Sequence, residues 1–265
     1  MNTVAPSSEA ETLEQLKQTV SASRLSCWSK CRLQFYFRYV QKLQKPPTAA
    51  LHLGGVVHLV LQAWNMARWK RQPFNVEVYR SVFDTGWKDQ QTPIDWQGEE
   101  ESQRNTAWNM LERYFIETPI KSNELPEAVE VPAEVDLSNH GLPVLRGVLD
   151  LVRAGSRIVD FKTSARTPNA EDAKHQNQIQ LSSYSILYRE ATGKRESGRE
   201  LHHLVKLKTP KIIITPVEPM TDREQTRLFK QMESYVNGIE GKDFVPSVGM
   251  HCLSCEFFNE CRRWG

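Results

Sequence analysis

Several features that mark particular classes of protein are missing from this 265-residue sequence. No apolar run reaches the roughly 18 residues that a transmembrane helix needs. Residues 1–18 are acidic and polar, without the basic start and apolar centre of a secretory signal. The glycine-rich Gly-x4-Gly-Lys-Ser/Thr phosphate loop is absent, which excludes an ATP-driven motor within this chain. We therefore expect a cytoplasmic protein with no membrane association, and any helicase motor would be a separate protein.

Charge of one sign is also scarce. The 34 Lys and Arg residues are offset by 32 Asp and Glu residues, which leaves a formal net charge of only +2. Any contact with nucleic acid must therefore come from local clusters of basic residues. Hydrophobic residues make up 39% and charged residues 25% of the chain. This balance suits a globular fold and excludes a mostly disordered one.

The first half of the chain is predicted to be mainly helical. Ser23 can cap a helix that runs to about Val40, and Lys45-Pro46-Pro47 then breaks the helical pattern. Apolar residues at helical spacing predict a second helix over residues 51–70. Two more polar helices are predicted over residues 75–90 and 99–117.

From Glu130 the apolar residues take on the pattern of β-strands. Hairpin-type turn residues, Asn139-His140-Gly141 and Ala154-Gly155-Ser156, separate the first three strands. The predicted strands cover residues 130–137, 142–152, 157–161, 201–208 and 211–217, with helices over 170–192 and 221–239. We therefore expect an α/β fold in which a mixed central sheet is flanked by helices.

The expected organisation is one large domain after a loosely ordered start. Residues 1–20 form the loose segment and residues 21–265 the single domain. Within the domain we expect a mainly helical lobe over 21–127, an α/β core over 128–220, and a C-terminal helix with a cysteine loop over 221–265.

The stretch "GVLDLVRAGSRIVDFKTS" places charged residues at the ends of two apolar strands. Side chains alternate along a strand, so Asp160 and Lys162 share one face. A register that pairs Leu151-Val152 with Ile158-Val159 brings Asp150 near Asp160. Two adjacent carboxylates repel each other unless a cation lies between them.

Mg²⁺ or Mn²⁺ suits such a pair, because these ions bind carboxylates, a carbonyl and water. A lysine beside the ion can orient or deprotonate a bound water and counter the charge on a phosphate under attack. The chemistry indicated is metal-assisted phosphodiester hydrolysis. The alternative is a solvated surface hairpin, but charges that directly follow buried strand residues need compensation.

These residues resemble a known family. "GVLD" followed by "VDFKT" is similar to the core motif of the PD-(D/E)XK nucleases, and specifically of their RecB-type branch. His58 in "GGVVH" resembles the Gly-x-x-x-His element of that branch, and "QLSSY" resembles its Gln-x-x-x-Tyr element. The resemblance implies a restriction-endonuclease-like core and covers the chain from about Ser21 to Cys261.

The resemblance also implies a role for each matching residue. His58, Asp150 and Asp160 would bind the metal together with the carbonyl of Phe161, and Lys162 would be the catalytic lysine. Gln180 and Tyr184 would support the site; they are four residues apart and therefore share a helix face. Glu134, on the strand before the hairpin, is a further candidate ligand, with a plain strand-edge charge as the alternative.

Five cysteines in an intracellular chain of this size do not predict a disulfide framework, so metal or cluster binding is the first hypothesis. Cys252, Cys255 and Cys261 form a Cys-x2-Cys-x5-Cys pattern, one ligand short of a tetrahedral set. Cys27 or Cys31 could complete it. Either would fasten the first helix to the last turn, at a gain of several kcal/mol in the loop-entropy picture. Thiolates bind zinc or an iron–sulfur cluster.

The arrangement of one upstream and three C-terminal cysteines resembles the iron–sulfur nucleases of the RecB type. These include the AddB nuclease domain and the CRISPR-associated exonucleases of that group. In them the upstream ligand precedes an aromatic-rich stretch, which matches Cys31 in "KCRLQFYFRYV" and not Cys27. The resemblance therefore implies a structural 4Fe–4S cluster on Cys31, Cys252, Cys255 and Cys261, with zinc as the alternative and Cys27 as a free thiol.

Basic residues interleaved with aromatics are typical of surfaces that track a phosphate backbone. Candidates are Arg32, Arg38, Lys42, Lys45, Arg166, Lys206, Lys208 and Lys211. The resemblance implies a metal-dependent DNA exonuclease that acts on single-stranded or processed ends in repair, recombination or CRISPR-type adaptation, alongside a separate helicase or a CRISPR or recombination partner. The alternatives are a zinc-stapled nuclease and a catalytically inactive DNA-binding or assembly module with the nuclease fold.

Overall fold

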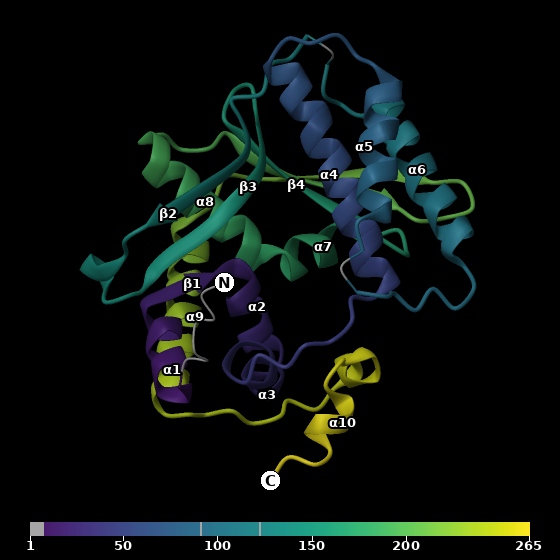
Figure 1. Cartoon of the computed structure of the whole chain (residues 1–265). Helices are drawn as coiled ribbons and strands as arrows, with labels where there is room; N and C mark the ends of the chain where they lie inside the picture. The colour runs from purple at the N-terminus through teal and green to yellow at the C-terminus, as the bar shows by residue number, and fades with distance from the viewer. Residues whose placement is uncertain (1–7, 91, 122) are drawn as a thin grey trace, which may run out of the picture. The chain divides into compact units, whose positions relative to one another are not determined.

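Two units, each built from separate stretches of the chain, make up the computed structural model, which describes residues 8–90, 92–121 and 123–265 (Figure 1). The first unit contains the described residues up to Lys45 together with Ala133–Gly147 and Thr221–Gly265. The second contains the described residues of Pro46–Pro132 and Val148–Met220. The predicted division into a segment 1–20 and a domain 21–265 stays a prediction.

The strands form a mixed sheet in the order β1-β3-β4-β5-β6, with β2 also paired to β3. β1 is parallel to β3, β3 antiparallel to β4, β4 parallel to β5, and β5 antiparallel to β6. Their bounds are β1 Thr19–Ser21, β2 Ala128–Val135, β3 Val144–Arg153, β4 Arg157–Ser164, β5 Gly198–Val205 and β6 Lys211–Val217. The predicted α/β class with a mixed sheet flanked by helices is therefore confirmed.

Turn chemistry sets the β3–β4 hairpin. Gly155 and Ser156 adopt left-handed backbone, with φ of 78° and 62°, which glycine accepts without steric cost and which matches the twist of a hairpin. The carboxylate of Glu127 accepts hydrogen bonds from both backbone N–H groups, at 2.9 and 3.0 Å. The loop is thus held in the conformation that fixes the pairing of the two strands.

Helices of the second unit cover the sheet with apolar faces. Figure 1 shows α4 and α5 side by side, with α6 next to α5. Their buried residues pack in one cluster with Leu151, Val159, Phe161 and Leu204 of the sheet, and each large side chain buried there contributes about 1.5–3 kcal/mol. The helices of this unit are α4 Ala49–Trp69, α5 Val76–Lys88, α6 Glu100–Glu117, α7 Ala170–Gln176 and α8 Gln178–Thr192.

The helix predicted over residues 170–192 is two helices. The break falls at Asn177, whose φ of −99° and ψ of 7° leave the helical region. The carbonyl of Ala173 accepts from both the backbone N–H and the side-chain amide of Asn177, at 3.1 and 2.8 Å, and such local side-chain bonds are typical of helix ends. α8 therefore begins just before Gln180 and carries it in its first turn.

The first unit contains short N-terminal elements and the C-terminal part of the chain. Its elements beyond β1 are α1 Glu9–Gln18, α2 Ala22–Lys30, α3 Arg32–Phe35, a π-helical turn Tyr36–Val40, α9 Asp222–Glu240 and α10 Phe258–Cys261, with 3-10 turns at Ser138–His140 and Met250–Ser254. No helix in the described parts of the chain has the length and hydropathy that a bilayer crossing requires.

Two predictions about the N-terminal region differ from the structure. Part of the segment expected to be loose forms α1, whose N-terminus has a capping box between Ser8 and Glu11 and whose Leu13 and Leu16 are buried; residues 1–7 lie outside the described residues. The helix predicted from Ser23 begins at Ala22, capped by Ser21, and is interrupted at Cys31 by extended backbone.

Close packing between α9 and α2 makes Gly238 sensitive to substitution. A Cβ atom at Gly238 would lie 2.1 Å from Cζ2 of Trp28, a buried ring in edge contact with Phe35, Tyr235 and Phe244. We expect Gly238→Ala to lower the free energy of unfolding by about 1–3 kcal/mol, because overpacking outweighs the gain in helix propensity of about 1 kcal/mol. Urea denaturation measures the change.

Gly55→Ala is the matched control for this prediction. Gly55 is an exposed position in α4 with no heavy atom within 4 Å of the added Cβ. It should therefore gain up to about 1 kcal/mol from helix propensity alone. Equal stability of the two alanine variants would contradict the tight contact at Trp28.

Candidate functional site

The β3–β4 hairpin brings the predicted acidic residues together in the second unit. Leu151 pairs with Val159 and Val152 with Ile158, so the predicted register is confirmed. Asp160 is fully buried and Asp150 is 8% exposed. The backbone N–H of Phe161 donates to Oδ2 of Asp150 at 3.1 Å, which fixes the Asp150 carboxylate beside β4.

α4 places His58 next to these carboxylates. Nδ1 of His58 lies 3.6 Å from Oδ2 of Asp150, and the imidazole packs edge-on against the ring of Phe161 with centroids 6.2 Å apart. One turn earlier, a Cβ atom at Gly54 would lie only 3.2 Å from Oγ1 of Thr163 on β4. The glycine of the Gly-x-x-x-His element therefore permits the close approach of α4 to β4.

Glu130 is the acid that joins His58 and Asp150. Ligand atoms of these three residues all lie within 4.8 Å of one another. Glu130 has a left-handed backbone, with φ of 49°, inside β2. Such a residue in a strand redirects its side chain relative to regular pleating.

Glu134, the acid expected from the sequence, is not part of this group. It lies in the first unit, where its side chain is 64% exposed and forms an ion pair with Arg146 at 3.0 Å. Both Glu130 and Glu134 fall on the same face of a regular strand, so alternation could not separate them. Pro132 between them signals irregular pairing, but it lies two residues from each acid and favours neither.

Burial and repulsion between carboxylates raise the pKa values of two acids at this site, so a cation beside them would favour their ionised forms. Burial, together with the charge of Asp150, raises the pKa of Glu130 to about 7. The pKa of Asp160 is also raised to about 7, mainly by burial and also by Asp150, while Lys162 opposes the rise. Burial lowers the pKa of His58, which favours the neutral imidazole that can bind a metal.

Lys162 connects Asp160 to α8. Its Nζ lies 3.0 and 2.8 Å from the two carboxylate oxygens of Asp160 and donates to Oε1 of Gln180 at 2.7 Å. Nε2 of Gln180 in turn donates to the hydroxyl of Tyr184 at 2.8 Å. The pKa of Tyr184 is raised, chiefly by burial, so its hydroxyl stays protonated. Asp160 and Lys162 of β4 thus share one site with Gln180 and Tyr184 of α8.

His203 is a neighbour of Lys162 that the sequence did not suggest. It pairs with Lys162 across β4 and β5 and is 5% exposed. Burial and the positive charge of Lys162 lower the pKa of His203 to about 4. The imidazole therefore adds no positive charge beside the lysine at neutral pH.

The donor set fits a divalent cation. It offers carboxylate oxygens and one imidazole nitrogen, which are ligands that Mg²⁺ or Mn²⁺ accepts. Oδ2 of Asp160 is buried, and its contact is the ion pair with the Lys162 ammonium at 2.8 Å. The fit to a divalent cation therefore depends on the oxygen and imidazole donors of His58, Glu130 and Asp150.

Four of the five cysteines line one small cavity in the first unit. Cys31, Cys252, Cys255 and Cys261 surround a volume of about 40 Å³ together with aromatic residues such as Phe257. Sγ of Cys31 accepts backbone N–H groups from Gln34 and Ser247, both at 3.5 Å. Burial and the other three thiols raise the pKa of Cys261.

Cys27 stands apart from this group. It is buried and is not among the residues that line the cavity. Burial raises its pKa to about 11, so the thiol stays protonated. The geometry therefore separates Cys27 from the four cysteines that the sequence grouped together.

Ion pairs hold the cysteine-bearing tail against the N-terminal helices within the first unit. Nε of Arg38 donates to Glu256 at 3.0 Å, and Nζ of Lys45 donates to Glu260 at 2.6 Å. Arg32 pairs with Asp243. These contacts bring residues more than two hundred positions apart into the same neighbourhood, as ligation by Cys31 and Cys261 would require.

Comparison with known proteins gives three findings. The family model of the PD-(D/E)XK nuclease superfamily matches residues 19–262. A crystal structure of a "Putative exonuclease" from Eubacterium rectale is 16% identical, with a TM-score of 0.64 over 98% of this chain and 93% of that one; this likeness shows a shared fold. The crystal structure of SSO0001 is 12% identical over 96% of this chain and 93% of that one, with a TM-score of 0.44. No curated protein matches.

Proposed function

Because the chain belongs to the PD-(D/E)XK nuclease superfamily, we propose that it is a divalent-metal-dependent deoxyribonuclease. We propose further that it acts as an exonuclease on single-stranded or processed DNA ends in repair, recombination or CRISPR-type adaptation. One observation carries the proposal: His58, Glu130 and Asp150 converge to within 4.8 Å in the unit where Lys162 contacts Asp160 and Gln180. Such a group can bind a metal ion, and the ordered ammonium of Lys162 supports the same chemistry.

Within this proposal, His58, Glu130, Asp150 and Asp160 hold Mg²⁺ or Mn²⁺, helped by the carbonyl of Phe161. A bound divalent cation supplies Lewis acidity toward the phosphate and lowers the pKa of a water. Relative to the ligands expected from the sequence, this proposal adds Glu130 and omits Glu134. Asp150 is held in place by the N–H of Phe161, so its orientation does not depend on the ion.

Lys162 is the proposed catalytic residue. Its ammonium can donate a proton to the leaving oxygen or counter the negative charge that develops on the phosphate. Gln180 is a positioning residue, since its carbonyl accepts from Lys162 and its amide donates to Tyr184. Tyr184 restricts the amide in turn, and the chain of bonds leaves Nζ few alternative positions.

Cys31, Cys252, Cys255 and Cys261 are the proposed ligands of a structural 4Fe–4S cluster. Their shared cavity and the two N–H groups on Cys31 support the assignment. Four thiolates also suit tetrahedral zinc, so a zinc site on the same cysteines is the alternative.

A metal titration with two acid variants tests the proposed function. Wild-type protein should release labelled nucleotides from end-labelled DNA with Mg²⁺ or Mn²⁺ and not with EDTA. Glu130→Gln should need at least about 10-fold more metal for half-maximal rate, because loss of a residue that only supports a ligand already costs about 10–100-fold in metal affinity and loss of a ligand charge costs no less. Glu134→Gln, the matched control four residues away, should have the metal requirement of wild type, because its partner is Arg146.

Substrates are single-stranded, duplex and flapped DNA, each labelled at either end in turn. Loss of label from ends before internal cuts is the exonuclease outcome. If no substrate is hydrolysed in a metal-dependent way, the protein is a DNA-binding module and not an enzyme. Equal metal requirements of the two glutamine variants would contradict the assignment of Glu130.

A further inference from the structure

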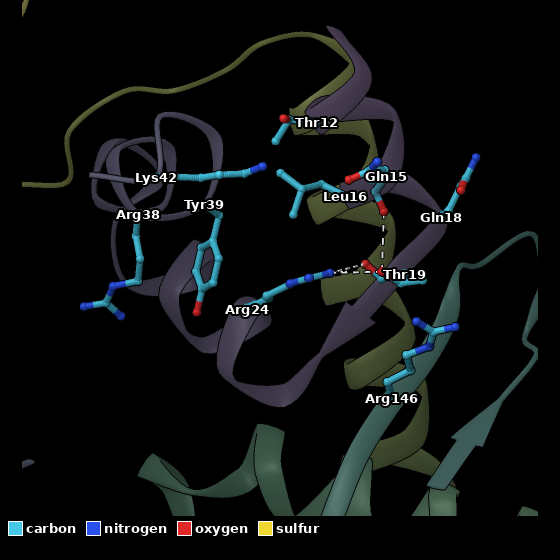
Figure 2. Close-up of a pocket in the computed structure, with 10 residues that line it drawn as sticks. All are labelled: Thr12, Gln15, Leu16, Gln18, Thr19, Arg24, Arg38, Tyr39, Lys42 and Arg146. Atoms are coloured by element: carbon cyan, nitrogen blue, oxygen red, sulfur yellow. Dashed lines mark hydrogen bonds between the residues drawn. The ribbon is translucent and has the colours of Figure 1, made fainter. Parts of the chain in front are cut away.

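A basic cavity in the first unit has no role in the chemistry above. Figure 2 shows the residues around it, and its volume is about 540 Å³. They come from α1, β1, α2, the π-helical turn and its C-terminal end, and β3. Four of the lining residues are cationic and none is acidic: Arg24, Arg38, Lys42 and Arg146.

Three of the four cations are placed to meet an anion in the cavity. Figure 2 shows Lys42 extending toward Thr12 and Leu16, and Arg24 extending toward Thr19, whereas the guanidinium of Arg38 points away from the others. Arg24 is fixed by hydrogen bonds to the carbonyl and hydroxyl of Thr19, both at 3.0 Å. Its remaining donors and the ammonium of Lys42 supply positive charge to the cavity.

The acidic partner of Arg146 is replaceable. Glu134 pairs with it at 3.0 Å, but the two side chains are 64% and 58% exposed. Exposed ion pairs contribute little to stability. A phosphate offers the guanidinium two oxygens in a bidentate geometry and can take the place of the carboxylate.

Tyr39 adds an aromatic surface to the same wall. Its ring is partly exposed, and Arg24 lies 6.0 Å from the ring centroid. Amide side chains of Gln15 and Gln18 also line the cavity. Cations beside an aromatic ring are the combination with which proteins bind single strands, because the phosphates contact the cations and an unpaired base stacks on the ring.

We propose that this cavity binds one or two nucleotides of single-stranded DNA, with phosphates on Lys42, Arg24 and Arg146 and a base against Tyr39. The volume of about 540 Å³ lies in the range of roughly 300–1,000 Å³ that is typical of small-ligand sites, which admits an unpaired nucleotide and not a duplex. The choice of DNA rests on the proposed function; the charge and the aromatic ring would recognise any single strand.

Binding without divalent metal tests the site separately from hydrolysis. The full chain is titrated into fluorescein-labelled oligo-dT in EDTA, and anisotropy gives Kd over a range of salt concentrations. Lys42→Gln with Arg146→Gln should weaken binding about tenfold at low salt and reduce the slope of log K against log salt by about 1.4, since each contact with a single strand contributes about 0.7. Tyr39→Leu should weaken binding about fivefold or more with the slope unchanged.

Lys30→Gln with Lys230→Gln is the matched control. Both lysines are exposed in the first unit and neither lines the cavity, so the same charge is removed elsewhere. The control should retain the wild-type Kd within about twofold. Identical Kd and salt slope in the cavity pair and the control pair would overturn the proposal, as would wild-type protein that does not bind the oligonucleotide.

Photo-crosslinking gives a readout that needs no variant. An oligonucleotide with 5-iododeoxyuridine, irradiated with wild-type protein, should attach to the tryptic peptide that contains Tyr39, which is bounded by Arg38 and Lys42. Crosslinks only to other peptides would count against the site. Protein that binds through this cavity but never hydrolyses DNA with metal would defeat the proposed function and leave this inference standing.

Discussion

Lys162→Met should lower the rate of metal-dependent DNA hydrolysis by about 10²–10⁴-fold. Methionine keeps much of the length of the side chain but removes the ammonium that contacts Asp160 and Gln180. The loss has two parts. The phosphate loses its proton donor or counter-charge, and Asp160 loses the positive neighbour that opposes the rise of its pKa.

A change of pH separates the effect on Asp160 from the loss of the ammonium at the phosphate. Without Lys162 the pKa of Asp160 rises further above its usual range, because burial and the charge of Asp150 both raise it. The carboxylate is then more protonated at neutral pH and binds metal less well. Raising the pH to about 9 should restore metal affinity in Lys162→Met but not the rate, since an Asp side chain re-ionises and the ammonium stays absent.

Rates are measured on end-labelled DNA at saturating metal. Lys194→Met is the control, since Lys194 is exposed in the turn between α8 and β5 of the same unit; it should retain the wild-type rate. Circular dichroism checks that both variants are folded. Hydrolysis by Lys162→Met within about twofold of wild type would remove this lysine from the mechanism.

Cys261→Ser should remove iron and sulfide from protein purified without oxygen. Wild-type protein is expected to be brown and to contain both elements. Loss of one of four proposed ligands opens a closure that spans the chain from Cys31 to Cys261, which in the loop-entropy picture contributes about 5 kcal/mol. The free energy of unfolding should therefore fall by several kcal/mol, and aromatic residues such as Phe257 should become exposed.

Cys27→Ser is the matched control, because Cys27 lies outside the cysteine cavity and its pKa is raised by burial. It should keep its iron and sulfide. Metal analysis and urea denaturation distinguish the outcomes. Zinc without iron in wild-type protein would show that the four cysteines bind zinc and not an iron–sulfur cluster. Equal iron in both serine variants would contradict ligation by Cys261.

The hairpin at the candidate site was predictable because its determinants are local. Alternation along a strand fixes which residues share a face, and a three-residue turn fixes the register. Those two rules place Asp160 beside Lys162 and Asp150 next to the following strand, as found. A helical spacing of four places Gln180 and Tyr184 together for the same reason.

Glu130 could not be distinguished from Glu134 by such rules. The choice depends on a left-handed residue inside β2, which pairing with β3 has to stabilise and which no local pattern encodes. The break at Cys31 is similar: its sequence is compatible with a continuous helix, but its backbone is extended, with φ of −164° and ψ of 115°. The start of α1, in contrast, was missed although its determinant is local: Ser8 and Glu11 have the spacing of a capping box.

The interleaved composition of the units bears on the order in which the chain can fold during synthesis. Every stretch of the second unit, up to Met220, leaves the ribosome before the first unit has received Thr221–Gly265. Domains fold as their last residues emerge. The residues around Lys162 can therefore adopt their native packing while the chain is still being synthesised. The N-terminal helices can complete their packing only after α9 and the cysteine-bearing tail have been made.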